Sequence, residues 1–205
     1  KKWKLYTKYI SEILQELQEC LSSGSTAEFA MIGQLIDQAE KIFVAGMGRT
    51  GYVMKGFTMR LEQAGYEAYW IGDTNTPAAG KGDLLILGSG SGETETLKVY
   101  AKKAKELQIP IIVFTTCRES SLHADAAVAV VINADAKFKE DTEKKSVQPM
   151  GSLFEEALFI SLEALVIQLM EKRGISEKEL KKRPKPLAKL LVYSIFSTIL
   201  SPTFS

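Results

Sequence analysis

Cysteine is scarce in this sequence of 205 residues, and its two cysteines, Cys20 and Cys117, form no motif. Their separation does not match the short spacings of metal-binding or redox-active cysteine pairs, which argues against a thiolate metal centre and a thiol redox enzyme. We therefore expect two buried thiols in a reducing compartment, and hence a cytoplasmic protein.

Net charge and long apolar runs are lacking as well. The 26 Lys and Arg residues nearly balance the 25 Asp and Glu residues, and a net charge of +1 gives no reason to expect nucleic acid or a membrane surface as a partner. A largely apolar stretch, residues 187–200, is shorter than the roughly 20 residues that a membrane-spanning helix needs. The basic start is not followed by a continuous apolar run, so no signal peptide is expected.

The sequence does contain a regular alternation of short apolar runs and helical patterns. The apolar runs, which we predict to be strands, cover residues 41–46, 67–71, 83–87, 110–115 and 127–132. Helical patterns cover residues 3–21, 25–39, 47–64, 93–107, 120–124 and 151–173. Because the runs are continuously apolar and helices separate them, we predict an α/β fold in which helices cover both faces of a parallel sheet.

Two of the helical patterns predict an oligomer. Residues 151–173 are apolar nearly all round the helix, so this helix should be buried on most of its sides. A single domain of this size rarely buries a helix so fully, and we infer a subunit interface there. The amphipathic helix at residues 3–21 also argues against a monomer. Before the apolar helix, residues 133–150 form a long polar loop, and long loops are often functional.

The loop of residues 88–94, which reads Gly-Ser-Gly-Ser-Gly-Glu-Thr, follows a predicted strand and precedes a predicted helix. Its small residues leave the backbone N–H groups open, and the hydroxyls of Ser89, Ser91 and Thr94 lie near the helix start. Backbone N–H groups, the helix dipole and hydroxyl donors all favour an anion, so the sequence predicts a phosphate-binding site here.

A second glycine motif, residues 46–51, reads Gly-Met-Gly-Arg-Thr-Gly and matches the spacing of dinucleotide-binding loops. Asp73 comes 22 positions after Gly51, where a ribose-binding acid would lie. An NAD-binding oxidoreductase is therefore one alternative. A dinucleotide site does not need a second hydroxyl-rich loop, whereas a sugar phosphate needs one loop for the phosphate and another for the sugar. We therefore favour a sugar phosphate as the ligand.

Together, residues 46–51 and 88–94 resemble the sugar isomerase (SIS) domain family. Within it, the sequence Gln-Pro-Met-Gly-Ser-Leu-Phe-Glu at residues 148–155 is similar to that of the 6-phospho-3-hexuloisomerases. The resemblance covers about residues 9–180. We expect a single SIS domain with N-terminal helices at residues 1–183, with its core at about 40–175, and an atypical tail at 184–205.

The resemblance implies a three-layer αβα sandwich with a five-stranded parallel sheet in flavodoxin-like order. It implies that D-arabino-hex-3-ulose 6-phosphate is isomerised to fructose 6-phosphate, in the ribulose monophosphate pathway of formaldehyde fixation, without a metal or a cofactor. It also implies a homotetramer, a dimer of dimers, whose active sites are completed across subunit interfaces.

The hydroxyls of Ser89, Ser91 and Thr94 would bind the phosphate, while Gly48 and Arg49 would line the sugar. Thr50 keeps a hydroxyl where many family members have serine. The full set that we assign to substrate and phosphate binding is Gly48, Arg49, Thr50, Ser89, Ser91, Glu93, Thr94 and Gln148. Within this set, Glu93 would begin a helix and shape the loop, and Gln148 could hydrogen-bond sugar hydroxyls.

The isomerisation needs a base. Moving a carbonyl between C3 and C2 passes through an enediol(ate), so one group must take a proton from one carbon and return it to the other. A carboxylate in a dry pocket, with a raised pKa, suits this task. Glu155 is the candidate, because it lies where the family has its catalytic Glu, although a helix-start carboxylate can also simply favour the dipole. Glu156 is the alternative carboxylate.

The chain departs from the family near its end. The family usually has a His-Ala-Asn-Leu-Glu segment whose His reaches a neighbouring subunit's site, whereas residues 183–187 read Arg-Pro-Lys-Pro-Leu. The only histidine, His123, is expected to be a surface or cap residue. Either this chain lacks that acid, or the tail from about Pro184 is not the native one. A sugar-phosphate-binding module without catalysis is therefore a second alternative.

Overall fold

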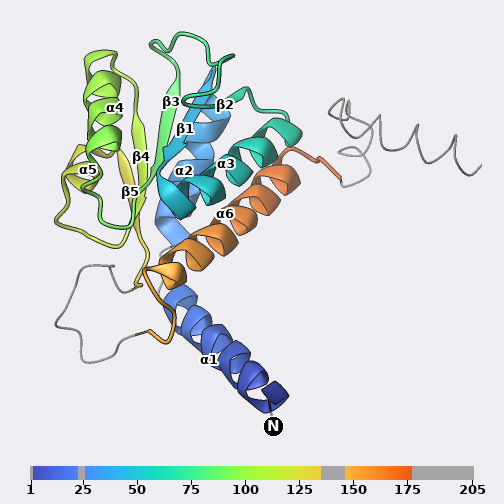
Figure 1. The fold of residues 1–205 in the computed structure, drawn as a ribbon. Helices are drawn as coiled ribbons and strands as arrows, with labels where there is room; N and C mark the ends of the chain where they lie inside the picture. The colour runs from blue at the N-terminus through green and yellow to red at the C-terminus, as the bar shows by residue number, and fades with distance from the viewer. Residues whose placement is uncertain (1, 23–25, 135–145, 177–205) are drawn as a thin grey trace, which may run out of the picture.

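The computed structural model describes residues 2–22, 26–134 and 146–176, which form a parallel sheet between two layers of helices (Figure 1). The five strands are β1 (Ile42–Gly46), β2 (Ala68–Trp70), β3 (Leu84–Gly88), β4 (Ile111–Thr115) and β5 (Val128–Val131). Their order in the sheet is β2-β1-β3-β4-β5, and every neighbouring pair is parallel. The expected five-stranded, flavodoxin-like sheet is confirmed.

The helices divide between the two faces of the sheet. They are α1 (Lys2–Ser22), α2 (Thr26–Gln38), α3 (Gly48–Gln63), α4 (Glu95–Glu106), α5 (Ser121–Asp125) and α6 (Ser152–Lys172). One apolar cluster joins the sheet to α2, α3 and α6, with the end of α1 at its margin, and a second joins the opposite face to α4 and α5 (Figure 1). The sandwich therefore has the three layers that were expected.

The central strands are continuously apolar because both of their faces are covered. In β1, Ile42 and Val44 belong to the cluster under α2, α3 and α6, whereas Phe43 and Ala45 belong to the cluster under α4 and α5. All five residues of β1 are buried, and the same holds for β3 and β4. Alternate side chains of one strand thus enter two different cores, which explains the apolar runs; the polar exception in these three strands is the buried Thr115 at the end of β4.

The direction in which successive strands are added to the sheet reverses after β2, and this reversal places the two glycine loops side by side. The chain passes from β1 to the edge strand β2 and returns to β3 on the other side of β1, so Gly46 and Gly88 are partners at the carboxyl ends of adjacent strands. Helix α3 then leaves towards one face of the sheet and α4 towards the other. In open α/β sheets, ligands bind in the crevice that such a switch point creates.

Helices α1 and α6 bury less apolar surface in the single chain than the sequence suggested. Helix α1 projects from the body of the molecule (Figure 1), and Trp3, Tyr6 and Leu14 are 80%, 60% and 60% exposed. Helix α6 buries nine residues, but Phe159 and Ile167 are about half exposed, so the expectation of burial on most sides is not met within one chain. No helix in residues 2–22, 26–134 or 146–176 is long and apolar enough to cross a membrane.

Some expectations need correction and others lie beyond the described residues. The helix expected from Glu93 begins at Glu95, and Cys117 is only half-buried, whereas Cys20 is buried and burial raises the pKa of its thiol to about 11. Part of the expected long loop (residues 135–145), the segment at 183–187 and the tail at 184–205 lie outside the described residues.

Candidate functional site

Close packing of glycines brings the first turn of α3 against the ends of β1 and β3. A Cβ atom on Gly88 would lie 3.1 Å from Thr50 Cγ2 and still closer to the side chain of Met54. A Cβ atom on Gly51 would lie 2.8 Å from the carbonyl oxygen of Gly46. Only glycine permits this approach, which places the buried side chain of Thr50 beside the start of the loop at residues 88–94.

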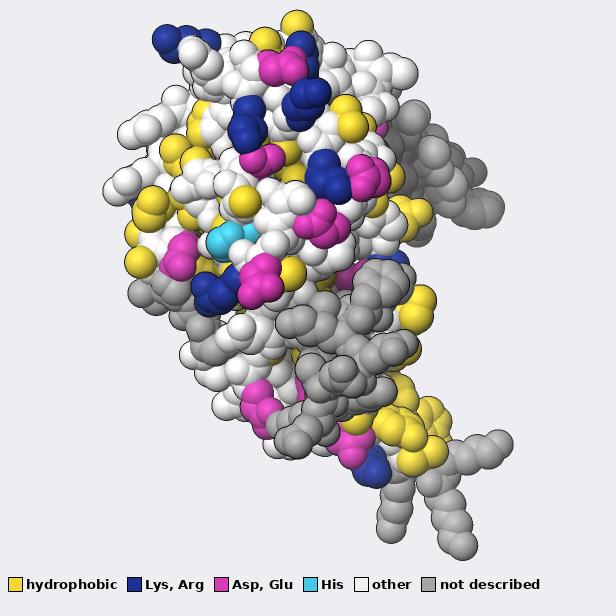
Figure 2. All heavy atoms as spheres, turned by 90° about the vertical axis from the view of Figure 1, so that its left-hand side faces the viewer, with side chains coloured by type: hydrophobic (Ala, Val, Ile, Leu, Met, Phe, Trp, Pro, Cys, Tyr) yellow, Lys and Arg dark blue, Asp and Glu magenta, His cyan; other side chains and the backbone are white. Residues whose placement is uncertain are grey.

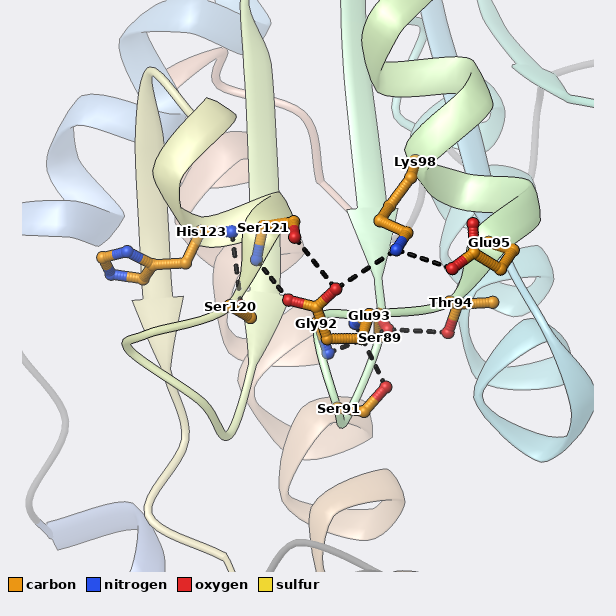
Figure 3. A network of polar contacts seen from close by, with 10 residues as sticks. All are labelled: Ser89, Ser91, Gly92, Glu93, Thr94, Glu95, Lys98, Ser120, Ser121 and His123. Atoms are coloured by element: carbon orange, nitrogen blue, oxygen red, sulfur yellow. Dashed lines mark hydrogen bonds and ion pairs between the residues drawn. The ribbon is translucent and has the colours of Figure 1, made fainter.

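The loop of residues 88–94, called here the phosphate loop, is held in shape by its own hydroxyls (Figure 3). Ser89 Oγ lies 2.9 Å from Thr94 Oγ1 and accepts a hydrogen bond from the backbone N–H of Gly92 at 3.1 Å. Ser91 Oγ accepts from the backbone N–H of Glu93 at 3.2 Å. Ser89 is only 3% exposed, so its hydroxyl is buried inside the loop and holds the loop's shape. Ser91 and Thr94 are half-buried.

The start of α4 has donors that suit an anion. Thr94 is the N-cap residue of α4, and its side chain makes no capping hydrogen bond. The N–H groups in the first turn of any helix have no acceptor within the helix, and the dipole makes this end positive. A phosphate placed over the phosphate loop would therefore meet backbone donors and the half-buried hydroxyls of Ser91 and Thr94.

Glu93 does not point into the space over the phosphate loop. Its carboxylate accepts hydrogen bonds from the backbone N–H and the hydroxyl of Ser121, at 2.5 and 2.9 Å, and Lys98 Nζ lies 3.3 Å away (Figure 3). The backbone bond from Ser121, followed by the bond from its hydroxyl, lowers the pKa of Glu93 below its ordinary value. The side chain is a charged contact between the phosphate loop and α5.

Glu155 lies in a pocket with a volume of about 460 Å³, together with Arg49. Arg49 Nε is 2.6 Å from Glu155 Oε2, and the side chain of Glu155 is 13% exposed. The same buried oxygen accepts no hydrogen bond of good geometry within the described residues, so this contact is a pairing of charges. The pocket is lined by Leu17, Arg49, Tyr52, Val53, Glu155, Glu156, Phe159 and Ile160.

The pocket and the phosphate loop are neighbours through the first turn of α6. A Cβ atom on Gly90 would lie 3.3 Å from Cδ1 of Phe154, the residue before Glu155. The loop at residues 88–94 is therefore in contact with the turn of α6 that carries Glu155. Gly48, at the start of α3, has no atom within 4 Å of a Cβ position and has a φ of +58°, so the backbone beside Arg49 is open.

Gln148 takes a place that the sequence did not indicate. With its amide nitrogen turned towards Glu156, it donates to both carboxylate oxygens, at 2.8 and 3.0 Å. The chain just before it is tied to α1, because Glu16 accepts hydrogen bonds from the hydroxyl of Ser146 and the backbone N–H of Val147, at 2.6 and 2.8 Å. Gln148 thus contacts the second carboxylate of the pocket and is placed there by α1.

The structure brings together some of the expected residues and adds others. Arg49 forms an ion pair with Glu155, and the hydroxyls of Ser89 and Thr94 are hydrogen-bonded to each other. The side chain of Glu93, in contrast, is hydrogen-bonded to Ser121 of α5. Sequence reasoning missed Ser121 and Lys98, which hold Glu93, because contacts between separate elements leave no local signal. It also missed Tyr52, which lies three positions after Arg49 on α3, a spacing that places both residues on one side of the helix.

His123 and Asp73, two polar residues that the sequence singled out, lie outside the phosphate loop and the pocket of Glu155. The ring of His123 points away from the phosphate loop (Figure 3), and its backbone N–H donates to Ser120 Oγ at the start of α5 at 3.4 Å. Asp73 is paired with Lys55 at 2.9 Å. In the part of the chain that the structure describes, no group of three or more His, Cys, Asp or Glu side chains could hold a metal ion.

Comparisons with known proteins identify relatives along most of the chain. The family model of the SIS domain matches residues 35–160. The 3-hexulose-6-phosphate isomerase of Bacillus subtilis is 38% identical over 172 residues, which cover 84% of this chain and 93% of that protein. The protein of the same name from Methanocaldococcus jannaschii is 39% identical over 155 residues, which cover 74% of this chain and 81% of that protein.

A solved structure agrees with these relatives. A hypothetical protein from Methanococcus jannaschii, for which a molecular function of 3-hexulose-6-phosphate isomerase was inferred, superposes with a TM-score of 0.71 at 32% identity. The match covers 90% of this chain and 99% of that chain. The residues that the SIS model matches, 35–160, include both glycine loops and the first turn of α6.

Proposed function

The chain belongs to the SIS domain family, and on that premise we propose that it is a phosphosugar isomerase that converts D-arabino-hex-3-ulose 6-phosphate to fructose 6-phosphate. The relatives named above carry the name of this isomerase. The observation that carries the proposal is the contact of the phosphate loop with the turn of α6 that holds Glu155. The proposed phosphate anchor and the proposed carboxylate base therefore come from neighbouring parts of the structure.

In the proposed mechanism, the phosphate binds at the phosphate loop and the sugar extends towards Arg49 and Glu155. Glu155 takes the proton from C2 of the hexulose, which leaves an enediolate across C2 and C3, and returns the proton to C3. The hydroxyl proton moves from the C2 oxygen to the C3 oxygen, so the C2 carbonyl of fructose 6-phosphate forms and no atom is gained or lost. The reaction needs no metal and no cofactor.

Arg49 has a part in this mechanism through its charge. Its Nε lies 2.6 Å from Glu155 Oε2. When Glu155 takes the proton, its own negative charge disappears and a negative charge develops on the enediolate oxygen. The guanidinium then stabilises that oxygen in place of the carboxylate, and this stabilisation exists only along the reaction path.

Assembly completes the proposal. We place the enzyme in the cytoplasm, in the ribulose monophosphate pathway of formaldehyde fixation, as a homotetramer built from two dimers. The apolar side chains that α1 and α6 leave exposed support association of the chains. Leu17 of α1 and Phe159 and Ile160 of α6 line the pocket of Glu155, so a neighbouring subunit on these helices would border the active site.

The test is the substitution Glu155→Gln, which keeps the size of the side chain and removes the base. We expect kcat to fall by about 10²–10⁴-fold, the usual contribution of a general base, while sugar phosphate affinity stays within a few-fold. Turnover is followed by coupling fructose 6-phosphate formation to a dehydrogenase, and proton exchange at C2 is followed by NMR in D₂O.

Glu156→Gln is the matched control, because Glu156 is the neighbouring carboxylate of the same pocket. It should retain proton exchange. If Glu155→Gln still exchanges the C2 proton and Glu156→Gln does not, the base is Glu156.

The other candidate is a sugar-phosphate-binding module without catalysis, which residues 183–187 favour because they lack the family's terminal histidine. Tight binding of fructose 6-phosphate by the wild type without proton exchange would establish that candidate. A titration with NAD tests the dinucleotide alternative, which requires saturable binding.

A further inference from the structure

The phosphate loop is attached to the end of β4 through Gly90 and to the start of α5 through Glu93. Near its start, the carbonyl oxygen of Gly90 accepts from the backbone N–H of Thr116 at 3.0 Å and from the hydroxyls of Thr115 and Thr116 at 3.1 and 2.9 Å. Near its end, the carboxylate of Glu93 accepts from both donors of Ser121. Figure 3 shows this second attachment beside the half-buried Ser91.

A carboxylate at position 93 is unexpected in a loop that binds an anion. A negative side chain pointing at a phosphate would repel it, and the energy of that repulsion grows as water is excluded. Here the charge is directed away, towards α5, and Lys98 Nζ lies 3.3 Å from it. Glu95, the first residue of α4, has a side chain that is 85% exposed and lies 2.6 Å from Lys98 Nζ. Within the described residues its carboxylate pairs with Lys98 and not with α5.

We propose that Glu93 is a positioning residue that clamps the phosphate loop onto the first turn of α5 and so fixes the backbone donors that receive the phosphate. This inference rests on the proposed function and replaces a direct contact between Glu93 and the substrate. The contact of Glu93 with α5 lies next to the tightest packing of the loop, because a Cβ atom on the preceding residue, Gly92, would overlap the Ser120 side chain. Donors that are fixed before binding lose no entropy when the phosphate arrives.

The phosphate does not take part in the chemistry, so it is bound equally in the ground state and the transition state. Loosening the loop should therefore weaken substrate binding and leave the chemical step nearly unchanged, which means a higher KM with a similar kcat. A purely structural role for Glu93 would instead lower the fraction of folded protein and leave KM unchanged.

The experiment compares Glu93→Ala with Glu95→Ala in the full chain. Both substitutions remove one negative charge near Lys98, but only the first removes the contact with α5. We expect Glu93→Ala to raise KM for the hexulose phosphate, and the Kd of fructose 6-phosphate and inorganic phosphate measured by calorimetry, by about 10-fold. Glu95→Ala should leave these values within about twofold. Equal values for the two variants would overturn the proposal.

Two further variants separate hydrogen bonding from charge. Glu93→Gln keeps an oxygen for the backbone N–H of Ser121 and should retain affinity within about threefold, whereas a loss as large as that of Glu93→Ala would contradict the clamp. Ser121→Ala removes one of the two donors and should raise the Kd by about threefold. If Glu93→Ala does not fold, Ser121→Ala decides the matter, and a Kd equal to that of the wild type overturns the proposal.

The binding measurement also keeps this inference apart from the proposed function. A wild-type protein that binds neither fructose 6-phosphate nor inorganic phosphate would refute the phosphate site itself. A wild type that binds both ligands, with Glu93→Ala unchanged from it, would refute only the clamp.

Discussion

Gly92 is the residue of the phosphate loop with the least freedom to change. Its φ is +66°, in the left-handed region, and a Cβ atom would overlap Ser120 Oγ and Cβ. Both effects act against any other residue, and the space cannot be widened without moving the N-cap of α5. The glycine thus allows the loop and α5 to touch, and Glu93, the next residue, bonds across that contact.

We therefore expect Gly92→Ala to lower the free energy of unfolding by about 2–4 kcal/mol, from the backbone strain and the overlap together, and to weaken phosphate binding. Urea unfolding and calorimetry measure the two effects. Gly56→Ala is the control, because Gly56 lies inside α3 with nothing within 4 Å of its Cβ position. It should stabilise the protein by about 0.5–1 kcal/mol. A Gly92→Ala variant as stable as the wild type would show that the loop and α5 can separate freely.

The same residues show what the sequence could and could not predict about the site. Glycine and serine at 88–94 predicted an anion loop, because small residues and hydroxyls have few other reasons to gather after a buried strand. The direction of the Glu93 side chain was not predictable, because its partner Ser121 is 28 residues away. The contact of Gln148 with Glu156 was hidden for a similar reason, since the path of the chain before α6 depends on Glu16 of α1.

Among the elements, α2 and α6 are joined at their C-terminal ends by a cluster around Asp37. Tyr66 Oη and Lys172 Nζ donate to the Asp37 carboxylate at 2.7 and 2.6 Å, and the Arg173 guanidinium lies 3.7 Å from the centre of the Tyr66 ring. Burial opposes the charged form of Asp37, but the hydrogen bonds from Lys172 and Tyr66 outweigh it and lower its pKa. The cluster holds α6 against α2 at the end opposite to Glu155.

Because the pKa of Asp37 is lowered on folding, its charged form stabilises the protein above the pKa of the unfolded chain, and this contribution is lost as the pH falls through the lower folded value. Asp37→Asn should therefore lower the free energy of unfolding by about 1–2 kcal/mol at pH 7, and the difference from the wild type should shrink below about pH 4. Guanidinium unfolding from pH 3 to pH 8 measures it. The control Glu106→Gln removes an exposed pair with Lys103 and should have little effect. A difference that does not change with pH would contradict this account.

The strands were predictable nearly to the residue, whereas the surroundings of the helices were not. Both faces of β1, β3 and β4 are covered, so an unbroken apolar run marked each strand. The apolar circumference of α6 predicted burial, but the single chain covers only part of it. A pattern of apolar side chains shows that one face of a helix is buried, but it does not show which element or subunit covers that face. The fold was therefore easier to predict than the packing of α1 and α6.

For the molecule as a whole, charged and exposed apolar side chains gather in different places. The side formed by α4 and α5 presents mixed positive and negative side chains, while apolar side chains gather at the end where α1 projects (Figure 2). Six large apolar residues of α1 are at least 39% exposed: Trp3, Leu5, Tyr6, Tyr9, Ile10 and Leu14. An apolar surface that is continuous along a helix is typical of a contact between proteins.

We therefore expect the wild type to form an oligomer, and Leu14→Glu to shift it towards smaller species in light scattering after size-exclusion chromatography. Leu14 is 60% exposed in the single chain, so the substitution should disturb the contact between subunits more than the fold. Val99→Glu, at a position 65% exposed on α4, is the control and should leave the molar mass unchanged. A wild type that is monomeric at micromolar concentration would refute the proposed assembly.

The late position of α6 in the chain has a consequence for synthesis on the ribosome. The phosphate loop and its partners on α5 emerge within the first 125 residues, but Glu155 and the helix that covers α3 come only afterwards. A nascent chain that ends before α6 has the loop to which we assign the phosphate but lacks Glu155, the proposed base, and it exposes the apolar side of α3. Chain elongation thus delivers the proposed phosphate site first and the proposed base last, together with the helix that closes the core.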